Sequence, residues 1–378
     1  MTTDNTHQTV LLVGISTRAL AQSAVAAGWR VVSLDLFGDL DHPQDASAFS
    51  LTRDFGQPPE LAGLAEAATS FLAQVNAVVV EAGLENEPAL FELAHPNNTY
   101  SNGQAAVTRA RDLERMKQTI LGTGMLFPQN IYPGEALPGH GRYLIKDSQH
   151  SGGMGIQEWD GKTPPSAGTI LQQFVEGDLA SACFLADGKN AILVGMTRQY
   201  AGIRNLGAPP FAWCGNVAPL IDPGLENIIR CVIGKITAEC GLVGMNGIDF
   251  IIKGGSPTFL EVNPRPPASF ELFERLLGVN AFALHIDACQ GRLPDSLPSF
   301  LQDVAWGKGI LYAHQDVTVG DTGDWQSRSI ADIPHPGESI PAGAPICTLI
   351  AQGDDPDNCW QSILKRAKAL YREILQAK

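Results

Sequence analysis

The sequence has few features that would direct it to a membrane, a nucleic acid or an oxidising compartment. Its apolar runs fall well short of the roughly 18 residues that a membrane-spanning helix needs. No run of basic residues occurs, and the net charge of −14 opposes binding to phosphate backbones and anionic lipid surfaces. These absences argue against nucleic acid or a membrane as a partner.

Cysteine and histidine are also arranged without pattern. None of the seven cysteines forms a CxxC pair, and the eight histidines form no HxH or HExxH motif. An odd, dispersed set of cysteines is typical of reduced thiols in the cytosol. We therefore expect a cytoplasmic protein without a disulfide framework.

What is present indicates a folded protein of several domains. Hydrophobic residues make up 44% of the 378 positions and charged residues 17%, which is a globular composition. This length predicts two or three domains. We place them at residues 1–104, 105–292 and 293–378.

The first domain alternates strand and helix patterns. Residues 9–15 and 30–35 predict strands around a helix at 17–28, and a second helix at 60–74 precedes a strand at 77–83. This alternation predicts an α/β fold with a parallel sheet. The turn after Val13 lacks GxGxxG, which disfavours a dinucleotide site.

The rest of the chain mixes helices with short strands. A helix is expected at 105–123, followed by a strand-rich α+β section. Residues 293–353 are rich in Pro, Gly and Asp, and the apolar spacing at 358–376 predicts a final helix.

A glycine-rich loop follows a strand that carries Lys146. Glycines at 152, 153 and 155 would let backbone N–H groups approach a polyphosphate, while Lys146 supplies a compact positive charge. A glycine-rich hairpin with a lysine that reaches solvent is the alternative.

Oxygen side chains interrupt a second, otherwise apolar hairpin. Asp249, Glu261 and Asn263 would suit magnesium or manganese bound together with phosphate oxygens. We place the turn at 254–257 and expect Asp249 to share the face of the other two only if the loop has an odd length. Arg265 could clamp a phosphoryl group, and an ion-pair network with Lys253 or Arg265 is the alternative.

Together these segments resemble the ATP-grasp superfamily over residues 9–292, with Glu-Val-Asn-Pro-Arg at 261–265 as the most specific part. The resemblance implies an N-terminal Rossmann-like pre-ATP-grasp domain followed by a two-lobed ATP-grasp fold that binds ATP and Mg2+ or Mn2+. It implies that phosphates contact Lys146, Ser151, Gly152, Gly153 and Gly155. Adenine would contact Gln173, Phe174 and Val175, and the ribose would contact Asp178. The metal ligands would be Asp249, Glu261 and Asn263.

The sequence departs from the family pattern at one place. A lysine often follows the aspartate at the start of the ATP-grasp helix, but Leu113 follows Asp112 here. Lys117 lies four residues further on, on the same helical face, and could reach the same phosphate.

The resemblance implies a carboxylate–amine ligase that works through an acyl-phosphate, with Lys146 and Arg265 as catalytic groups and small-molecule substrates. A narrower likeness, at residues 16–23 and 34–41, is to ATP-grasp proteins of methanopterin- and methanofuran-linked one-carbon metabolism, which include tyramine–glutamate ligase. Arg198, Gln199 and Arg204 are expected to meet a substrate carboxylate, although a surface loop also explains this stretch. Many relatives form homodimers.

Two rival functions stay open at this point. A biotin-carboxylase-like subunit is one, because residues 332–349 resemble the C-terminal lobe of such enzymes, although no Ala-Met-Lys-Met occurs. A non-catalytic ATP-binding module is the other, and only Leu113 favours it.

Overall fold

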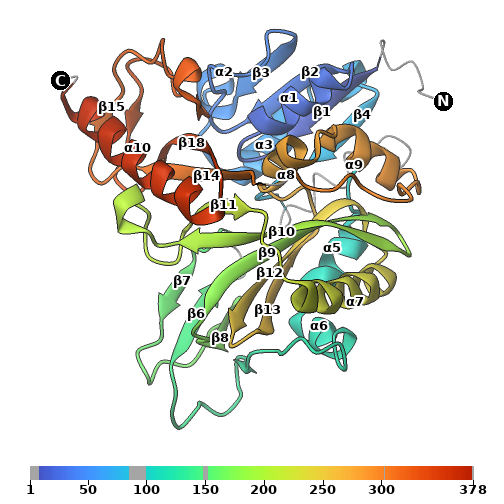
Figure 1. Ribbon diagram of the computed structural model, residues 1–378. Coiled ribbons are helices and arrows are strands. Elements are labelled where there is room, and N and C mark those ends of the chain that lie inside the picture. Colours follow the sequence, from blue (N-terminus) through green and yellow to red (C-terminus); the bar gives the residue numbers. More distant parts are fainter. Residues whose placement is uncertain (1–7, 85–98, 148–151, 302, 377–378) are drawn as a thin grey trace.

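A parallel sheet forms the N-terminal part of the computed structural model, which describes residues 8–84, 99–147, 152–301 and 303–376 (Figure 1). Its strand order is β3 (Ala46–Ser50), β2 (Arg30–Asp35), β1 (Thr9–Val13) and β4 (Ala77–Val80). The connecting helices are α1 (Arg18–Ala26), α2 (Leu51–Phe55), α3 (Leu61–Ala68) and the 3-10 turn η1 (Leu72–Gln74). The predicted parallel α/β sheet is confirmed.

Two expected helices differ from prediction. The helix expected at 60–74 ends at Ala68, and only a 3-10 turn follows it. The helix expected at 105–123 is two helices, α5 (Gln104–Arg111) and α6 (Leu113–Thr119). Asp112 breaks it because its backbone is extended and its side chain accepts a hydrogen bond from the N–H of Arg115, which caps α6.

A small antiparallel sheet carries the predicted glycine-rich hairpin. Its strand order is β5 (Asn130–Ile131), β8 (Thr169–Gln173), β6 (Tyr143–Asp147) and β7 (Ile156–Glu158). Tyr143, Ile131 and Leu171 form its own small core. The segment after β8 leads directly into the large sheet, so the two sheets are joined by a short linker.

An eight-stranded sheet forms the centre of the molecule (Figure 1). Its order is β13 (Ser256–Asn263), β12 (Val243–Lys253), β9 (Asp178–Asp187), β10 (Ala191–Ala201), β11 (Trp213–Ala218), β14 (Ala305–Tyr312), β18 (Pro345–Gly353) and β16 (Ile330–Ala331). Helix α7 (Pro223–Cys240) packs Ile229, Val232 and Ile236 into the core that contains Phe184 and Phe250. The mixed architecture confirms the predicted combination of α/β and α+β parts.

Three strands of the C-terminal segment, β14, β18 and β16, continue this sheet, and two others form a separate two-stranded sheet. Strand β14 pairs with β11, so hydrogen bonds cross the boundary expected at residue 292. The remaining elements are the strands β15 (Val317–Thr318) and β17 (Ser339–Ile340), the 3-10 turns η2 (Arg204–Leu206) and η3 (Gln326–Arg328), and the helices α8 (Phe270–Leu277), α9 (Ala281–Cys289) and α10 (Pro356–Gln376). Within the described ranges, no helix combines the length and apolarity needed to cross a bilayer.

Buried ion pairs fix the N-terminal sheet to the rest of the molecule. The guanidinium of Arg18 on α1 lies 3.0 Å from Glu271 on α8 and 2.8 Å from Asp332. Lys308 on β14 lies 3.0 Å from the same Glu271. Burial by itself would raise the pKa of Glu271, but these two cations hold that pKa well below its usual range. The carboxyl edge of the parallel sheet is therefore held against the large sheet.

Candidate functional site

Asp249 and Glu261 lie directly opposite each other in the β12–β13 hairpin. The turn is Gly254–Gly255, not 254–257, so its length is even and a regular ladder would place these carboxylates on opposite faces. A β-bulge makes Leu260 an extra residue and restores the shared face, which also carries Asn263. The prediction that the loop must have an odd length was wrong, because the bulge shifts the register of the two strands by one residue.

Asp249 is held by two amide side chains. It accepts hydrogen bonds from the Nδ2 of Asn263 at 2.9 Å and from the Nε2 of Gln199 at 2.8 Å. Burial and the charge of Glu261 raise the pKa of Asp249 to about 7. A guanidinium N–H of Arg265 donates to the Oδ1 of Asn263 at 3.1 Å, which places a cation beside the acidic pair. Two facing carboxylates whose charges repel are a setting that a divalent cation would stabilise.

The donor set fits magnesium better than a metal held by protein alone. Within the described ranges, no group of three His, Cys, Asp or Glu side chains is placed to hold a metal. The two carboxylates and the amide of Asn263 supply hard oxygen ligands and leave further positions for phosphate oxygens and water. Magnesium binds in this way in nucleotide sites, so the residues present fit the expected ion.

Lys146 lies half-buried on β6, where its Nζ donates to the Oε1 of Gln172 at 3.3 Å. Strand β7 pairs with β6 after the glycine-rich loop, as the hairpin pattern predicts. Gly152 accepts a hydrogen bond from the N–H of Trp213 at 2.9 Å, and a Cβ on Gly153 would overlap the carbonyl of Phe211. The described part of the loop therefore rests on the 209–213 segment. Ser151 lies outside the described residues.

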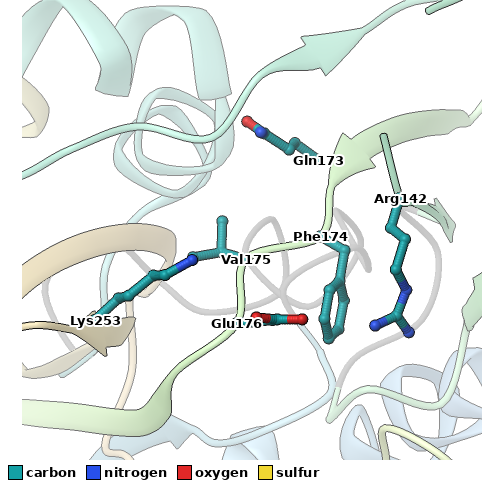
Figure 2. Close-up of a pocket in the computed structure, with 6 residues that line it drawn as sticks. All are labelled: Arg142, Gln173, Phe174, Val175, Glu176 and Lys253. Carbon is teal, nitrogen blue, oxygen red and sulfur yellow. The ribbon is translucent and has the colours of Figure 1, made fainter. Parts of the chain in front are cut away.

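A hollow of about 280 Å³ opens beside the linker between the two sheets (Figure 2). It is lined by Arg142, Gln173, Phe174, Val175, Glu176 and Lys253. The guanidinium carbon of Arg142 lies 4.0 Å from the ring centroid of Phe174, and Lys253 extends into the hollow from the opposite side. Sites for whole ligands begin at about 300 Å³, so this hollow suits one planar group of a larger ligand.

The three expected adenine contacts lie in this wall. The N–H groups of Gln173 and Phe174 already donate to the carbonyls of Gln129 at 2.8 Å and Arg142 at 2.9 Å. Among the described residues, the amide of Val175 has no backbone acceptor, so it can donate to a ligand. Asp178 follows at the exposed start of β9. The structure thus brings the expected base and ribose residues together along one linker.

The other expected contacts are dispersed. Lys117 lies on the exposed side of α6, with its Nζ 3.8 Å from Glu114. Gln199 contacts the acidic pair, whereas Arg198 is directed to α10 and lies 2.7 Å from Asp357. Arg204 is exposed on η2.

Sequence reasoning missed several residues of the site. Arg142, Glu176 and Lys253 line the hollow, and Phe211 and Trp213 contact the glycine-rich loop. Lys253 could have been found, because it lies four positions after Asp249 on the same strand and strand alternation places both on one face. The loop contact carries no local sequence signal, since it joins segments far apart in the chain.

The chain is similar to one family and to several known proteins. Residues 112–269 match the family described as the ATP-grasp domain. An uncharacterized protein of Methanocaldococcus jannaschii is 26% identical over 188 residues, which are 48% of this chain and 42% of that protein. A formate-dependent phosphoribosylglycinamide formyltransferase of Prochlorococcus marinus is 26% identical over 210 residues, 54% of this chain and 51% of that one. The aligned regions thus cover about half the length of these relatives or less.

Solved structures share the fold over most of the chain. N5-carboxyaminoimidazole synthetase from Staphylococcus aureus, complexed with ADP, has a TM-score of 0.69 at 15% identity and covers 97% of this chain and 100% of its own. Biotin carboxylase from Campylobacter jejuni has a TM-score of 0.69 at 13% identity, with coverage of 94% and 89%. L-amino acid ligase from Bacillus licheniformis has a TM-score of 0.65 at 13% identity, with 98% of both chains covered. At these identities the likeness establishes the fold alone.

Proposed function

Because the chain carries an ATP-grasp domain, we propose that it is an ATP- and magnesium-dependent ligase that joins a carboxylate to an amine through an acyl-phosphate. The observation that carries the proposal is the facing pair Asp249 and Glu261, with Arg265 directly beside it. A module that only binds nucleotide has no need to keep two repelling carboxylates next to a guanidinium.

The roles of the residues follow from their charge and position. Magnesium, held by Asp249, Glu261 and Asn263 when bound, would neutralise charge on the β- and γ-phosphates. A substrate carboxylate oxygen attacks the γ-phosphorus, and the bond from that phosphorus to ADP breaks. Lys146 and Arg265 stabilise the charge on the transferring phosphoryl group.

The second half-reaction forms the new bond. The amine nitrogen attacks the carbonyl carbon of the acyl-phosphate, phosphate leaves with the electrons of the C–O bond, and the nitrogen loses a proton to give an amide. The described end of the glycine-rich loop lies on the 209–213 segment, and this contact would help to exclude water from the intermediate.

The test is release of ADP and phosphate with a panel of carboxylates and amines. The native chain is compared with Glu261→Gln, and Glu239→Gln on the exposed face of α7 serves as the matched control. We expect release that needs both substrates, is lost in Glu261→Gln and is kept in the control. ATP binding without release across the panel would favour the non-catalytic module.

A carboxylase-type reaction is the second candidate, because residues 332–349 resemble the C-terminal lobe of such enzymes in sequence. Such a reaction would release phosphate with bicarbonate in the absence of an amine, so the same assay separates the two. We further expect a cytoplasmic enzyme, since all seven cysteines are free thiols. The homodimer and the narrower likeness to methanopterin-linked ligases stay predictions.

A further inference from the structure

Asn102 is a buried amide that joins two parts of the molecule and that the functions assigned so far do not use. Only 2% of its surface is exposed. Its Nδ2 donates to the carbonyl of Pro264 at 2.9 Å and to the Oδ1 of Asn246 at 2.7 Å. Its Oδ1 accepts from the N–H of Val243 at 2.8 Å. All the polar atoms of this side chain are therefore bonded to residues far away in the sequence, as a buried amide requires.

Pro264, the first of these partners, lies between a proposed metal ligand and the proposed phosphoryl clamp. Strand β13 ends at Asn263, and Arg265 follows Pro264. The N–H of Arg265 donates to the carbonyl of Asn263 at 2.8 Å, which closes a three-residue turn. Because the peptide unit is planar, the hydrogen bond from Asn102 to the carbonyl of Pro264 also orients the nitrogen of Arg265. Asn102 thus holds this turn from outside.

The other partners of Asn102 form a rigid support at the start of β12. The side chain of Asn246 is fully buried, and its Nδ2 donates to the carbonyls of Val243 at 3.2 Å and Gly244 at 3.0 Å. Asn102 cannot turn away from Pro264 without breaking its bonds to this support. Its amide therefore stays directed at the turn.

The segment that precedes Asn102 is bonded to the parallel sheet. Tyr100 donates its N–H to the carbonyl of Val78 on β4 at 2.9 Å, and the Oγ of Ser101 accepts from the N–H of Val80 at 2.8 Å. Helix α5 begins two residues after Asn102. This one side chain therefore joins the N-terminal sheet to the turn that it holds.

We propose that Asn102 is a positioning residue for Arg265. By holding the carbonyl of Pro264, it keeps the guanidinium beside Asn263, to whose Oδ1 Arg265 donates at 3.1 Å. A misplacement of about 1 Å can lower the rate roughly 100-fold, so a hydrogen bond outside the site can set the rate inside it. Because the neighbours of Asn102 are bonded to β4, a displacement of the N-terminal sheet also displaces Arg265. This inference rests on the proposed ligase function.

His285 provides a matched control for the joint between these segments. It is 1% exposed, and its ring bonds to the carbonyl of Tyr100 at 2.8 Å and accepts from the N–H of Met245 at 2.9 Å. It therefore connects the segment before α5 to β12, as Asn102 does. Its hydrogen bonds to described residues do not include one to Pro264. A loss of stability at the joint alone should have the same consequences at both positions.

The test separates positioning from stability. Asn102→Ser shortens the side chain, whereas Asn102→Asp keeps its shape and its acceptor for Val243 but has no donor for Pro264. These variants, His285→Gln and the native chain are compared in the ADP-release assay for kcat and the KM for ATP, and their melting temperatures are measured. Each substitution is also combined with Arg265→Ala.

We expect both Asn102 variants to lower kcat about 10- to 100-fold and to change the KM for ATP less than about twofold, because Arg265 acts on the transferring phosphoryl group. His285→Gln should lower the melting temperature but change kcat less than about twofold. In the Arg265→Ala chain, the Asn102 substitutions should lower kcat less than about twofold further, since the group that they position is gone.

Three results would each contradict the positioning role. They are a native kcat in both Asn102 variants, an equal loss of kcat in His285→Gln, and the same fold loss with and without Arg265. A native chain that releases no ADP with any substrate contradicts the ligase function instead, and this inference falls with it.

Discussion

The carboxylates of Asp249 and Glu261 share one face of a hairpin only because Leu260 is inserted into the second strand. Without a bound cation the two carboxylates repel each other, and burial together with this repulsion raises the pKa of Asp249 to about 7. The bulge therefore maintains an arrangement that is unfavourable for the protein alone and favourable with a metal.

Replacing one carboxylate of the Asp249–Glu261 pair should leave the stability of the chain intact while it abolishes metal binding. Glu261→Gln removes the repulsion, so the melting temperature without divalent ions should stay equal to that of the native chain or rise. The rise of a few degrees that magnesium and ADP give to the native chain should disappear, because binding stabilises only a state that binds. Differential scanning fluorimetry measures both effects, and Glu239→Gln is the control. A variant that magnesium and ADP stabilise as strongly as the native chain would contradict the assignment.

Gly153 tests the contact of the glycine-rich loop with the 209–213 segment. An added Cβ would overlap the carbonyl of Phe211, whereas Gly152 has a similar positive φ and open space around it. Gly152→Ala therefore carries the same backbone cost without the overlap. We expect Gly153→Ala to lower kcat/KM for ATP roughly tenfold more than Gly152→Ala does. Equal effects would show that backbone strain alone matters.

Two lysines were expected to contact phosphate, and the structure distinguishes them. Lys146 is half-buried beside Gln172, whereas Lys117 is exposed and pairs with Glu114. We expect Lys146→Ala to lower kcat/KM for ATP roughly 100-fold and Lys117→Ala to change it less than about twofold. Steady-state ADP release decides between them. A large effect of Lys117→Ala would show that α6 turns toward the nucleotide on binding.

The sequence predicts strands and polar motifs where local pattern is strong. The runs at 9–13, 30–35 and 77–80 are buried and rich in Val and Leu, and each is a strand as expected. The strand at 46–50 was missed because Ala-Ser-Ala-Phe-Ser has little apolar character. It pairs with β2 through tertiary contacts that no local pattern reveals.

In the site, too, local motifs could be predicted from the sequence, whereas features that depend on the folded structure could not. Asp249, Glu261 and Asn263 could be identified from the sequence, but the bulge that places Asp249 opposite Glu261 could not, because Leu260 is an ordinary strand residue. Asp112 broke a predicted helix through a cap that competes with helix continuation. Glu81 falls in the strand predicted at 77–83, and no local pattern indicates that its Oε1 is buried without a hydrogen-bond partner among the described residues.

His285 should make the fold sensitive to acid. Its Nδ1 accepts from the N–H of Met245 at 2.9 Å, so its Nε2 carries the hydrogen that is donated to the carbonyl of Tyr100 at 2.8 Å. This requires the neutral ring, and burial lowers its pKa from 6.5 to about 4. The folded pKa lies below the unfolded one, so the stability from this site is complete above pH 6.5 and is lost as the pH falls toward 4.

The acid sensitivity can be measured by urea unfolding at neutral and mildly acidic pH. The full effect is on the order of 3 kcal/mol, from 1.36 kcal/mol per pKa unit. His285→Gln should start less stable because it loses packing, but its stability should fall less on acidification than that of the native chain. The exposed His140 provides the control variant, His140→Gln. Equal pH dependence in all three chains would contradict the role of His285.

The acyl-phosphate is the central claim, and transfer of oxygen isotope tests it most directly. A carboxylate substrate labelled with ¹⁸O is incubated with the native chain, ATP, magnesium and the amine, and the products are analysed by mass spectrometry. The account predicts one ¹⁸O atom in the released phosphate, because the carboxylate oxygen that attacks the γ-phosphorus leaves with it. Label in AMP, or release of unlabelled phosphate during amide formation, would contradict it.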